Sequence, residues 1–219
     1  MKYLFTLLLL CAISFSFISV DGSDPTLKPF NAIKLEGNAT VHLVPGNSFG
    51  VQYADEGDKK SLDIHHSDKT LVVSGTGEVY VSLKQNSLVA IMLEGSGDIL
   101  CDKTLRSDDL AIELKGSGDI NLERLNANEL NVQLTGSGDI FLAGSAEEAN
   151  YNLQGSGDIK AAGLKATDVS ASILGSGDVS LHASETLEAR IHGSGDIHYD
   201  GNPQLTHAES LGNGKLVEL

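Results

Sequence analysis

The sequence predicts an all-β protein, a single-stranded parallel β-helix (a β-solenoid) with about 18–21 residues per coil. Three observations predict it. The tetrapeptide GSGD occurs six times between Gly95 and Asp196. Successive copies start 21, 20, 19, 20 and 18 residues apart. Apolar residues alternate with polar ones between the copies, so each repeat holds three short strands, which is one coil of a stacked solenoid.

The alternation predicts which side chains point inward. In the repeat that starts at Gly116, the apolar positions fall at every second residue around short breaks, as in strands with one buried face. Stacking the coils predicts two inward ladders. One contains Ile99, Ile120, Ile140, Ile159, Val179 and Ile197, and the other contains Leu114, Leu134, Leu153, Ile173 and Ile191.

Cys101 occupies the position of Leu122 in the next repeat, which predicts a small buried hydrophobic side chain. The alternative, a reactive thiol, would need positive charge nearby. A β-sandwich also has many short strands, but it does not explain one identical tetrapeptide for every three strands. An α-helical solenoid is excluded because Gly-Ser-Gly would interrupt each of its units.

The repeat extends beyond the six good copies and defines the expected domains. Degenerate copies begin at Gly75 and Gly212, and a further one at Gly37 lies two periods upstream of Gly75. We therefore expect a signal peptide in residues 1–22, less regular coils in 23–74 and the GSGD-repeat β-helix in 75–219, the last two forming one domain. The less regular residues are expected to cover the first coil, whereas little follows the last copy. This open end predicts end-to-end pairing with another copy or a partner.

Glycine and aspartate in the tetrapeptide are first of all corner residues. Glycine at the first and third positions is expected to supply positive φ angles, and aspartate to accept hydrogen bonds from backbone N–H groups of its own turn. The structural glycines are Gly95, Gly97, Gly116, Gly118, Gly136, Gly138, Gly155, Gly157, Gly175, Gly177, Gly193 and Gly195. Stacking also predicts an aspartate column, whose candidate role as a calcium site is the alternative to a structural one. Its members are Asp98, Asp119, Asp139, Asp158, Asp178 and Asp196.

Charge and the N-terminus indicate where the protein works. Residues 4–20 form an apolar run after Lys2, which is typical of a secretory signal peptide, so the protein is expected to be exported to the periplasm, the cell surface or the medium. Cys11 within it could alternatively carry a lipid anchor. The formal net charge of −15 and the absence of a basic cluster exclude nucleic acid as a partner. No transmembrane span is expected after residue 22.

No catalytic motif or cofactor-binding motif is found. His65 and His66 are adjacent, so on a strand they point to opposite faces, and His182, His192 and His198 are expected on outward positions. A β-helix carbohydrate-active enzyme is the alternative from another functional class. It would need a cleft with clustered carboxylates beside the irregular stretch Pro45–Ser67.

GSGDI with its alternating apolar residues, together with Phe30-Asn31-Ala32-Ile33-Lys34-Leu35-Glu36-Gly37 before Val41-His42-Leu43, resembles the family of exported bacterial proteins known as "putative auto-transporter adhesin, head GIN domain". The resemblance implies a right-handed β-helix and suggests adhesion, and it implies no catalytic residues. We therefore expect a non-catalytic solenoid for binding, adhesion or scaffolding at the cell envelope, with a calcium-stabilised scaffold as a further alternative. Its partner would be a protein or a polysaccharide held by outward side chains such as Asn121, Asn131, Gln133, Asn152 and Gln154.

Overall fold

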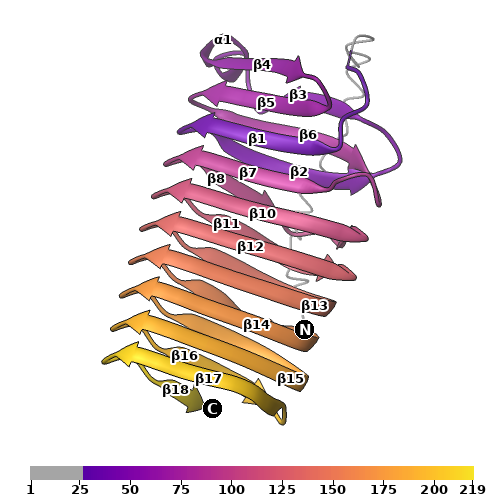
Figure 1. Cartoon of the computed structure of the whole chain (residues 1–219). Helices are drawn as coiled ribbons and strands as arrows, with labels where there is room; N and C mark the ends of the chain where they lie inside the picture. Colours follow the sequence, from indigo (N-terminus) through magenta and orange to yellow (C-terminus); the bar gives the residue numbers. More distant parts are fainter. Residues whose placement is uncertain (1–26) are drawn as a thin grey trace, which may run out of the picture.

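The computed structural model of the chain describes residues 27–219, so the predicted signal peptide and Cys11 lie outside the described residues. The described chain forms a parallel β-solenoid, which confirms the predicted fold class (Figure 1). Successive coils pair as parallel strands in register, and this pairing excludes the β-sandwich alternative.

Each regular coil has a long front strand, a shorter back strand and a very short side strand. From the N-terminal end of the axis, the front face contains β4 (Leu62–Ser67), β5 (Thr70–Gly75), β1 (Ala32–Gly37), β7 (Ala90–Gly95), β10 (Asp109–Gly116), β12 (Glu129–Gly136), the second halves of β13 (Ile140–Gly155), β14 (Ile159–Gly175) and β15 (Val179–Gly193), and β17 (Gln204–Gly212).

The back face lies behind it in Figure 1 and follows the same order. It contains β3 (Gly50–Tyr53), β6 (Glu78–Lys84), β2 (Thr40–Gly46), β8 (Asp98–Cys101), β11 (Ile120–Asn126), the first residues of β13, β14 and β15, and then β16 (Ile197–Gly201) and β18 (Leu216–Glu218). The side face begins with β9 (Leu105–Arg106), which pairs with the end of β11.

The two predicted inward ladders form the core. Ile120 pairs with Ile99 and Ile140 on its two sides, and Leu134 pairs with Leu114 and Leu153. All eleven predicted ladder residues are buried, with at most 1% of each exposed. Cys101 pairs with Leu122 as predicted and is 3% exposed. The alternation therefore predicted the buried side chains because every coil has the same register.

The coils at the N-terminal end do not follow the order of the sequence. Gly37 pairs with Gly75 on one side and with Gly95 on the other, so β1 lies between β5 and β7 (Figure 1). Gly37 lies two periods before Gly75 in the sequence, but it pairs directly with Gly75, so this spacing does not correspond to two coils. The residues between β2 and β5 form a cap instead of a coil. The number of residues between Gly37 and Gly75 therefore does not give the number of coils between them.

This cap closes the N-terminal end of the solenoid. β3 and β4 pair antiparallel with β6 and β5, so both outermost strands of the stack have a partner. The short helix α1 (Asp58–Ser61) precedes β4. Because an exposed strand edge can pair with other chains, these strands protect the first coil.

Candidate functional site

The glycine corner has two different physical requirements. Each first glycine has a positive φ, for example +137° at Gly116, and its carbonyl accepts the N–H groups of the serine and the second glycine one coil on, as Gly95 does from Ser117 at 2.9 Å. This second glycine, at the third position of the tetrapeptide, does not have positive φ, contrary to the sequence-based expectation. It is needed because a Cβ at Gly138 would lie 1.9 Å from the carbonyl oxygen of Gly118.

The aspartate column is hydrogen-bonded from coil to coil. The sequence predicted a donor within the same turn, but the donor is the backbone N–H of the next aspartate along the axis. Asp139 N–H donates to Asp119 Oδ1 at 2.9 Å, and Asp158 N–H donates to Asp139 Oδ1 at 2.9 Å. The same bond recurs from Asp98 to Asp196, and the last member accepts from the Lys215 N–H at 2.8 Å. These charge-assisted bonds offset the repulsion between stacked carboxylates, about 1 kcal/mol per pair in water.

One lysine adds positive charge to the middle of the column. Lys160 Nζ lies 2.5 Å from Asp139 Oδ2 and 3.8 Å from Asp158 Oδ2. Partial burial raises the pKa of Asp139, but the Lys160 ammonium and the Asp158 N–H outweigh it and hold that pKa below its usual value. The carboxylate therefore stays ionised at neutral pH and acts as an acceptor.

Replacing Asp139 by alanine should cost about 1–3 kcal/mol of unfolding free energy, because the Asp158 N–H loses its acceptor. Asp139→Asn keeps an oxygen at that position and should cost less. Chemical denaturation of the two variants measures the difference. Equal losses would mean that the charge, and not the inter-coil hydrogen bond, is what the aspartate contributes.

Calcium binding by the column is an untested alternative to its structural role. Within residues 27–219, no group of three or more His, Cys, Asp or Glu side chains is arranged to hold a metal ion. One carboxylate oxygen of each column member is already taken by a backbone N–H. We expect EDTA to leave the melting temperature unchanged. A fall that added calcium reverses would instead favour the calcium-stabilised alternative.

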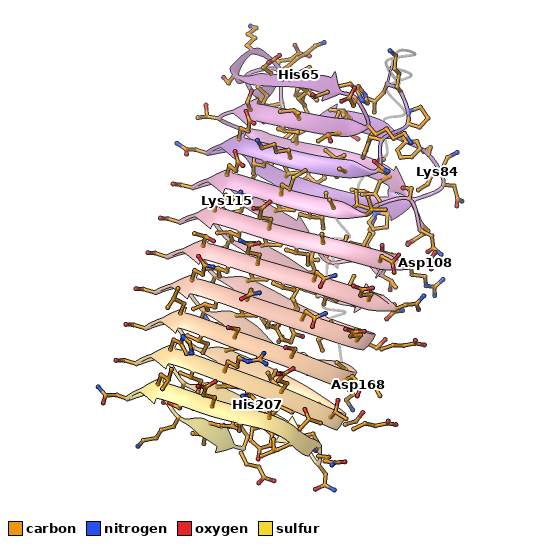
Figure 2. The ribbon with its side chains drawn as sticks, viewed as in Figure 1. His65, Lys84, Asp108, Lys115, Asp168 and His207 are labelled. Carbon is orange, nitrogen blue, oxygen red and sulfur yellow. The ribbon has the colours of Figure 1, made fainter. Side chains whose placement is uncertain are left out.

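The histidines are dispersed along the solenoid. His65 on β4 and His207 on β17 lie at opposite ends (Figure 2). His65 Nδ1 lies 3.2 Å from Asp63 Oδ2, whereas the ring of His66 packs against Phe30, so the two adjacent side chains diverge as predicted. His182 pairs with Asp200, at 3.3 Å between Nδ1 and Oδ2.

His192 and His198 belong to different faces. His192 lies in β15 on the front face and His198 in β16 on the back face. The structure therefore does not bring His182, His192 and His198 together as one cluster.

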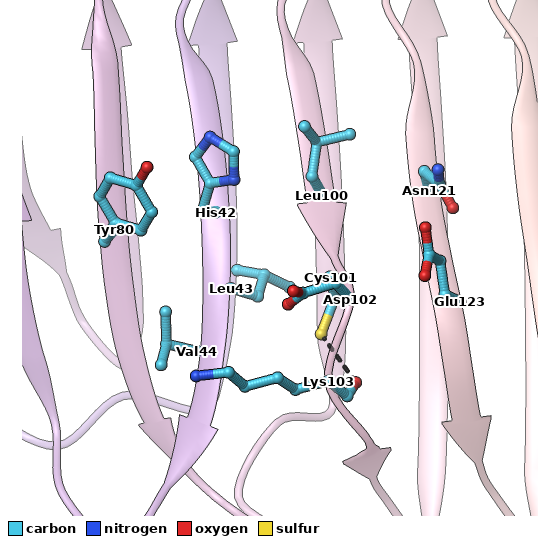
Figure 3. A pocket seen from close by; sticks show the side chains of 10 residues that line it. All are labelled: His42, Leu43, Val44, Tyr80, Leu100, Cys101, Asp102, Lys103, Asn121 and Glu123. Carbon is cyan, nitrogen blue, oxygen red and sulfur yellow. Dashed lines mark hydrogen bonds between the residues drawn. The ribbon is translucent and has the colours of Figure 1, made fainter. Parts of the chain in front are cut away.

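A hollow lies on the back face, and sequence reasoning did not find it. It has a volume of about 430 Å³ and opens where the back sheet divides (Figure 3). β2 pairs with β8 only from Thr40 to His42, although β2 continues to Gly46 beside β6. β8 ends at Cys101, after which the chain turns toward β9. The two strands therefore separate and leave the hollow between them.

One end of the hollow is an ordered aromatic pair. His42 and Tyr80 are stacked, with ring centroids 4.6 Å apart and ring planes 14° apart. Glu78 Oε1 accepts a hydrogen bond from Tyr80 Oη at 3.0 Å and lies 2.8 Å from His42 Nε2. The hydrogen bond to Glu78 raises the pKa of Tyr80, with further contributions from partial burial and the glutamate charge. The phenol is therefore a neutral donor, and its ring is held in a fixed orientation.

The floor and the opposite wall combine apolar and polar side chains. Figure 3 shows that Leu100 and Asn121 continue the row begun by Tyr80 and His42, with Glu123 beside Asn121. Asn121 Oδ1 is buried and has no hydrogen-bond partner among the described residues.

Cys101 lies at the floor of the hollow. Burial raises the pKa of its thiol to about 11, and Sγ donates to the Lys103 carbonyl at 3.3 Å. This high pKa does not favour the reactive-thiol alternative, because the thiolate is the nucleophile.

The other polar residues named from the sequence lie on the opposite face from Asn121. Asn131, Gln133, Asn152 and Gln154 are on the front strands β12 and β13. Asn150 Nδ2 donates to Asn131 Oδ1 at 3.2 Å, so part of this face is an amide ladder that satisfies itself. The structure thus divides the predicted polar face in two, and of these five residues only Asn121 lines the back-face hollow.

Comparison with solved structures identifies the fold with that of bacterial proteins described as adhesins. A putative adhesin from Bacteroides fragilis NCTC 9343 is 28% identical, with a TM-score of 0.80 over 88% of this chain and 94% of that one. A putative adhesin from Parabacteroides merdae ATCC 43184 is 24% identical, with a TM-score of 0.67 over 88% and 93%. A protein of Parabacteroides distasonis ATCC 8503 described as a putative lipid binding protein is 22% identical, with a TM-score of 0.63 over 88% and 94%.

Comparison with curated proteins finds no match to the chain. Comparison with sequence models of families gives the same assignment as the solved structures. Residues 27–219 contain no helix long and apolar enough to cross a membrane. The sequence model of the family described as "putative auto-transporter adhesin, head GIN domain" matches residues 29–203. Since this match spans most of the chain, the protein belongs to that family.

Proposed function

We propose that the protein is an exported, non-catalytic binding domain that works in adhesion at the cell envelope. The observation that carries this proposal is the back-face hollow, where side chains from neighbouring coils form one continuous row (Figure 3). A surface of this kind suits an extended partner that contacts several coils at once. Weak contacts repeated along a rigid scaffold add up to useful avidity. The family description as adhesin supports the same function.

The enzyme alternative would need free carboxylates beside the irregular stretch Pro45–Ser67. Asp55 and Asp58 lie there, but they stabilise the backbone around α1. Asp55 Oδ1 accepts from Gly57 N–H at 2.6 Å and Asp58 N–H at 2.9 Å, and Asp58 Oδ2 accepts from Asp55 N–H at 3.2 Å. Because these two carboxylates have structural partners, the irregular stretch itself does not supply free carboxylates for a β-helix carbohydrate-active enzyme.

An array of immobilised glycans and extracellular-matrix proteins tests the proposed function. We expect the purified protein to bind at least one polymer without shortening it, and to bind more strongly when many copies are displayed on beads. Release of shorter products from a bound polysaccharide would favour the enzyme alternative. An array on which nothing binds would contradict the proposal.

The C-terminal end of the solenoid supports pairing between copies. All nine residues of β17 are exposed, and Leu205 and Leu211 are 45% and 58% exposed. β17 pairs with β15 on one side. Its other side offers backbone groups to an added strand, unlike the covered strands at the N-terminal end. We propose that two copies, or a copy and its partner, meet at this end.

We expect the apparent mass of the protein to rise with concentration in sedimentation experiments, and Leu211→Lys to suppress the rise because charge on a strand edge opposes pairing. Leu174→Lys is the matched control, since Leu174 is 57% exposed on the same face two coils away. A monomer at every concentration would contradict end-to-end pairing, as would equal effects of the two substitutions.

A further inference from the structure

A row of outward side chains on the back face continues past the hollow. Each member follows an inward ladder residue, so it points away from the core. Strand register aligns the row from coil to coil. It runs through Tyr80, His42, Leu100, Asn121 and Phe141, and then through Lys160, Ser180 and His198. Aromatic and apolar members are therefore concentrated at the N-terminal end of the face.

The two aromatic side chains in this row that are most exposed lie four coils apart. Tyr80 is 37% exposed and Phe141 is 42% exposed. With coils about 4.8 Å apart, they are separated by about 19 Å along the axis. Surface hydrophobic residues occurring singly need no explanation, but Tyr80 lines the hollow and Phe141 lies on the same row, next to the lining residue Asn121. A ligand that contacts both must be extended.

The aromatic ring at the hollow is ordered before any ligand arrives. Tyr80 is stacked on His42 and hydrogen-bonded to Glu78. Binding to a fixed ring loses little side-chain entropy. His42 covers one face of the Tyr80 ring, so a sugar would contact the part of Tyr80 that stays exposed, 37% of the residue. This apolar surface with a polar rim suits a pyranose ring, where C–H groups lie in the middle and hydroxyl groups at the edge.

Polar groups around the rings match hydroxyl groups. The buried Asn121 Oδ1 has no donor among the described residues, and leaving a buried acceptor without a hydrogen bond is unfavourable. A ligand hydroxyl donating to this amide would supply that hydrogen bond. Lys103 can donate at the rim, and Asp102 and Glu123 can accept.

Charge narrows the ligand class further. Asp102 and Glu123 line the hollow with Lys103 as its one lysine, Glu78 is hydrogen-bonded to Tyr80 at one end, and the whole chain has a net charge of −15. An acidic polysaccharide would be repelled by this surface. We infer that the row from Tyr80 to Phe141 is a groove for a neutral polysaccharide lying along the solenoid axis, with sugar rings against Tyr80 and Phe141. This inference rests on the proposed binding function.

Affinity electrophoresis of the full chain through gels containing mannan, xylan or a soluble β-glucan tests the inference. We expect retardation by at least one of these neutral polymers and none by polygalacturonate. Tyr80→Ala and Phe141→Ser should each weaken binding at least tenfold. Tyr80→Phe should bind like the original protein, because the ring remains. Leu174→Ser, which removes an exposed apolar side chain from the front face, is the control and should change nothing.

The outcomes separate this inference from the proposed function. If a neutral polymer binds the Tyr80→Ala and Phe141→Ser variants undiminished, or if only acidic polymers or matrix proteins bind, the groove assignment is overturned while the binding function stands. If no polymer and no protein of the array binds, both are overturned. Circular dichroism and the melting temperature of each variant show whether the solenoid is intact. If Tyr80→Ala does not fold while Tyr80→Phe does, the binding of Phe141→Ser decides whether the inference holds.

Discussion

Gly138→Ala is expected to destabilise the protein by at least about 3 kcal/mol. The new Cβ would lie 1.9 Å from the Gly118 carbonyl oxygen and 3.0 Å from the carbonyl carbon of Ser117. Both are backbone atoms of the preceding coil, so no side-chain rotation relieves the contact. The coils on either side must move apart, and the inter-coil hydrogen bonds of the corner must weaken with them. Denaturant unfolding measures the loss.

The matched control is Gly46→Ala at the end of β2. A Cβ there meets nothing within 4 Å and the residue does not have positive φ, so the substitution should be neutral or stabilise by up to about 1 kcal/mol. Hydrogen exchange should show faster opening near Gly138 than elsewhere, because each coil contacts only its neighbours. Similar stabilities for the two variants would refute the claim that close packing of the coil backbones requires glycine at the third position.

Leu134→Ala should cost about 2–5 kcal/mol, the usual cost of removing a large buried aliphatic side chain. Leu134 is 0% exposed and lies between Leu114 and Leu153 in its ladder. Removing it leaves a cavity that the stacked neighbours cannot fill, because each is held by strand pairing on both sides.

Gln133→Ala is the matched control one residue earlier, where the side chain is exposed on the front face. It should change the unfolding free energy by no more than about 0.5 kcal/mol. Thermal and denaturant unfolding of the pair measure the contrast. Comparable losses would show that the alternation of buried and exposed residues along β12 is not what stabilises the coil.

The regular coils could be predicted from the sequence because their information is local and repeated. Ile120 and Leu134 recur at equivalent positions in each repeat, and stacking in register aligns them without further knowledge. The position of β1 could not be predicted in the same way. A spacing of two periods between Gly37 and Gly75 fits intervening coils as well as a cap, and only the strand pairing decides between them.

The sequence predicted which residues form the corner, but only part of the physical reason for each. The glycine at the third position is required because the backbone of another coil lies too close for a Cβ. The N–H donors to Asp119 and its equivalents also come from another coil. The hollow was missed because Tyr80, His42 and Leu100 come from coils that are out of sequence order. One feature of the sequence could have indicated the hollow. The residue after each GSGD[I/V] is outward and varies, so Leu100 and Phe141 could have been recognised as exposed apolar residues.

Distances between spin labels test most directly that the coils are stacked with β1 between β5 and β7. One label would replace His192, and the other would replace Glu94, Glu36 or Ser74 in a Cys101→Ser background. Strand register places these three positions five, six and seven coils from His192, at about 24, 29 and 34 Å. We predict that Ser74 is farther from His192 than Glu36 is. A longer distance for Glu36 than for Ser74, or distances that do not increase by about one coil spacing, would contradict the account.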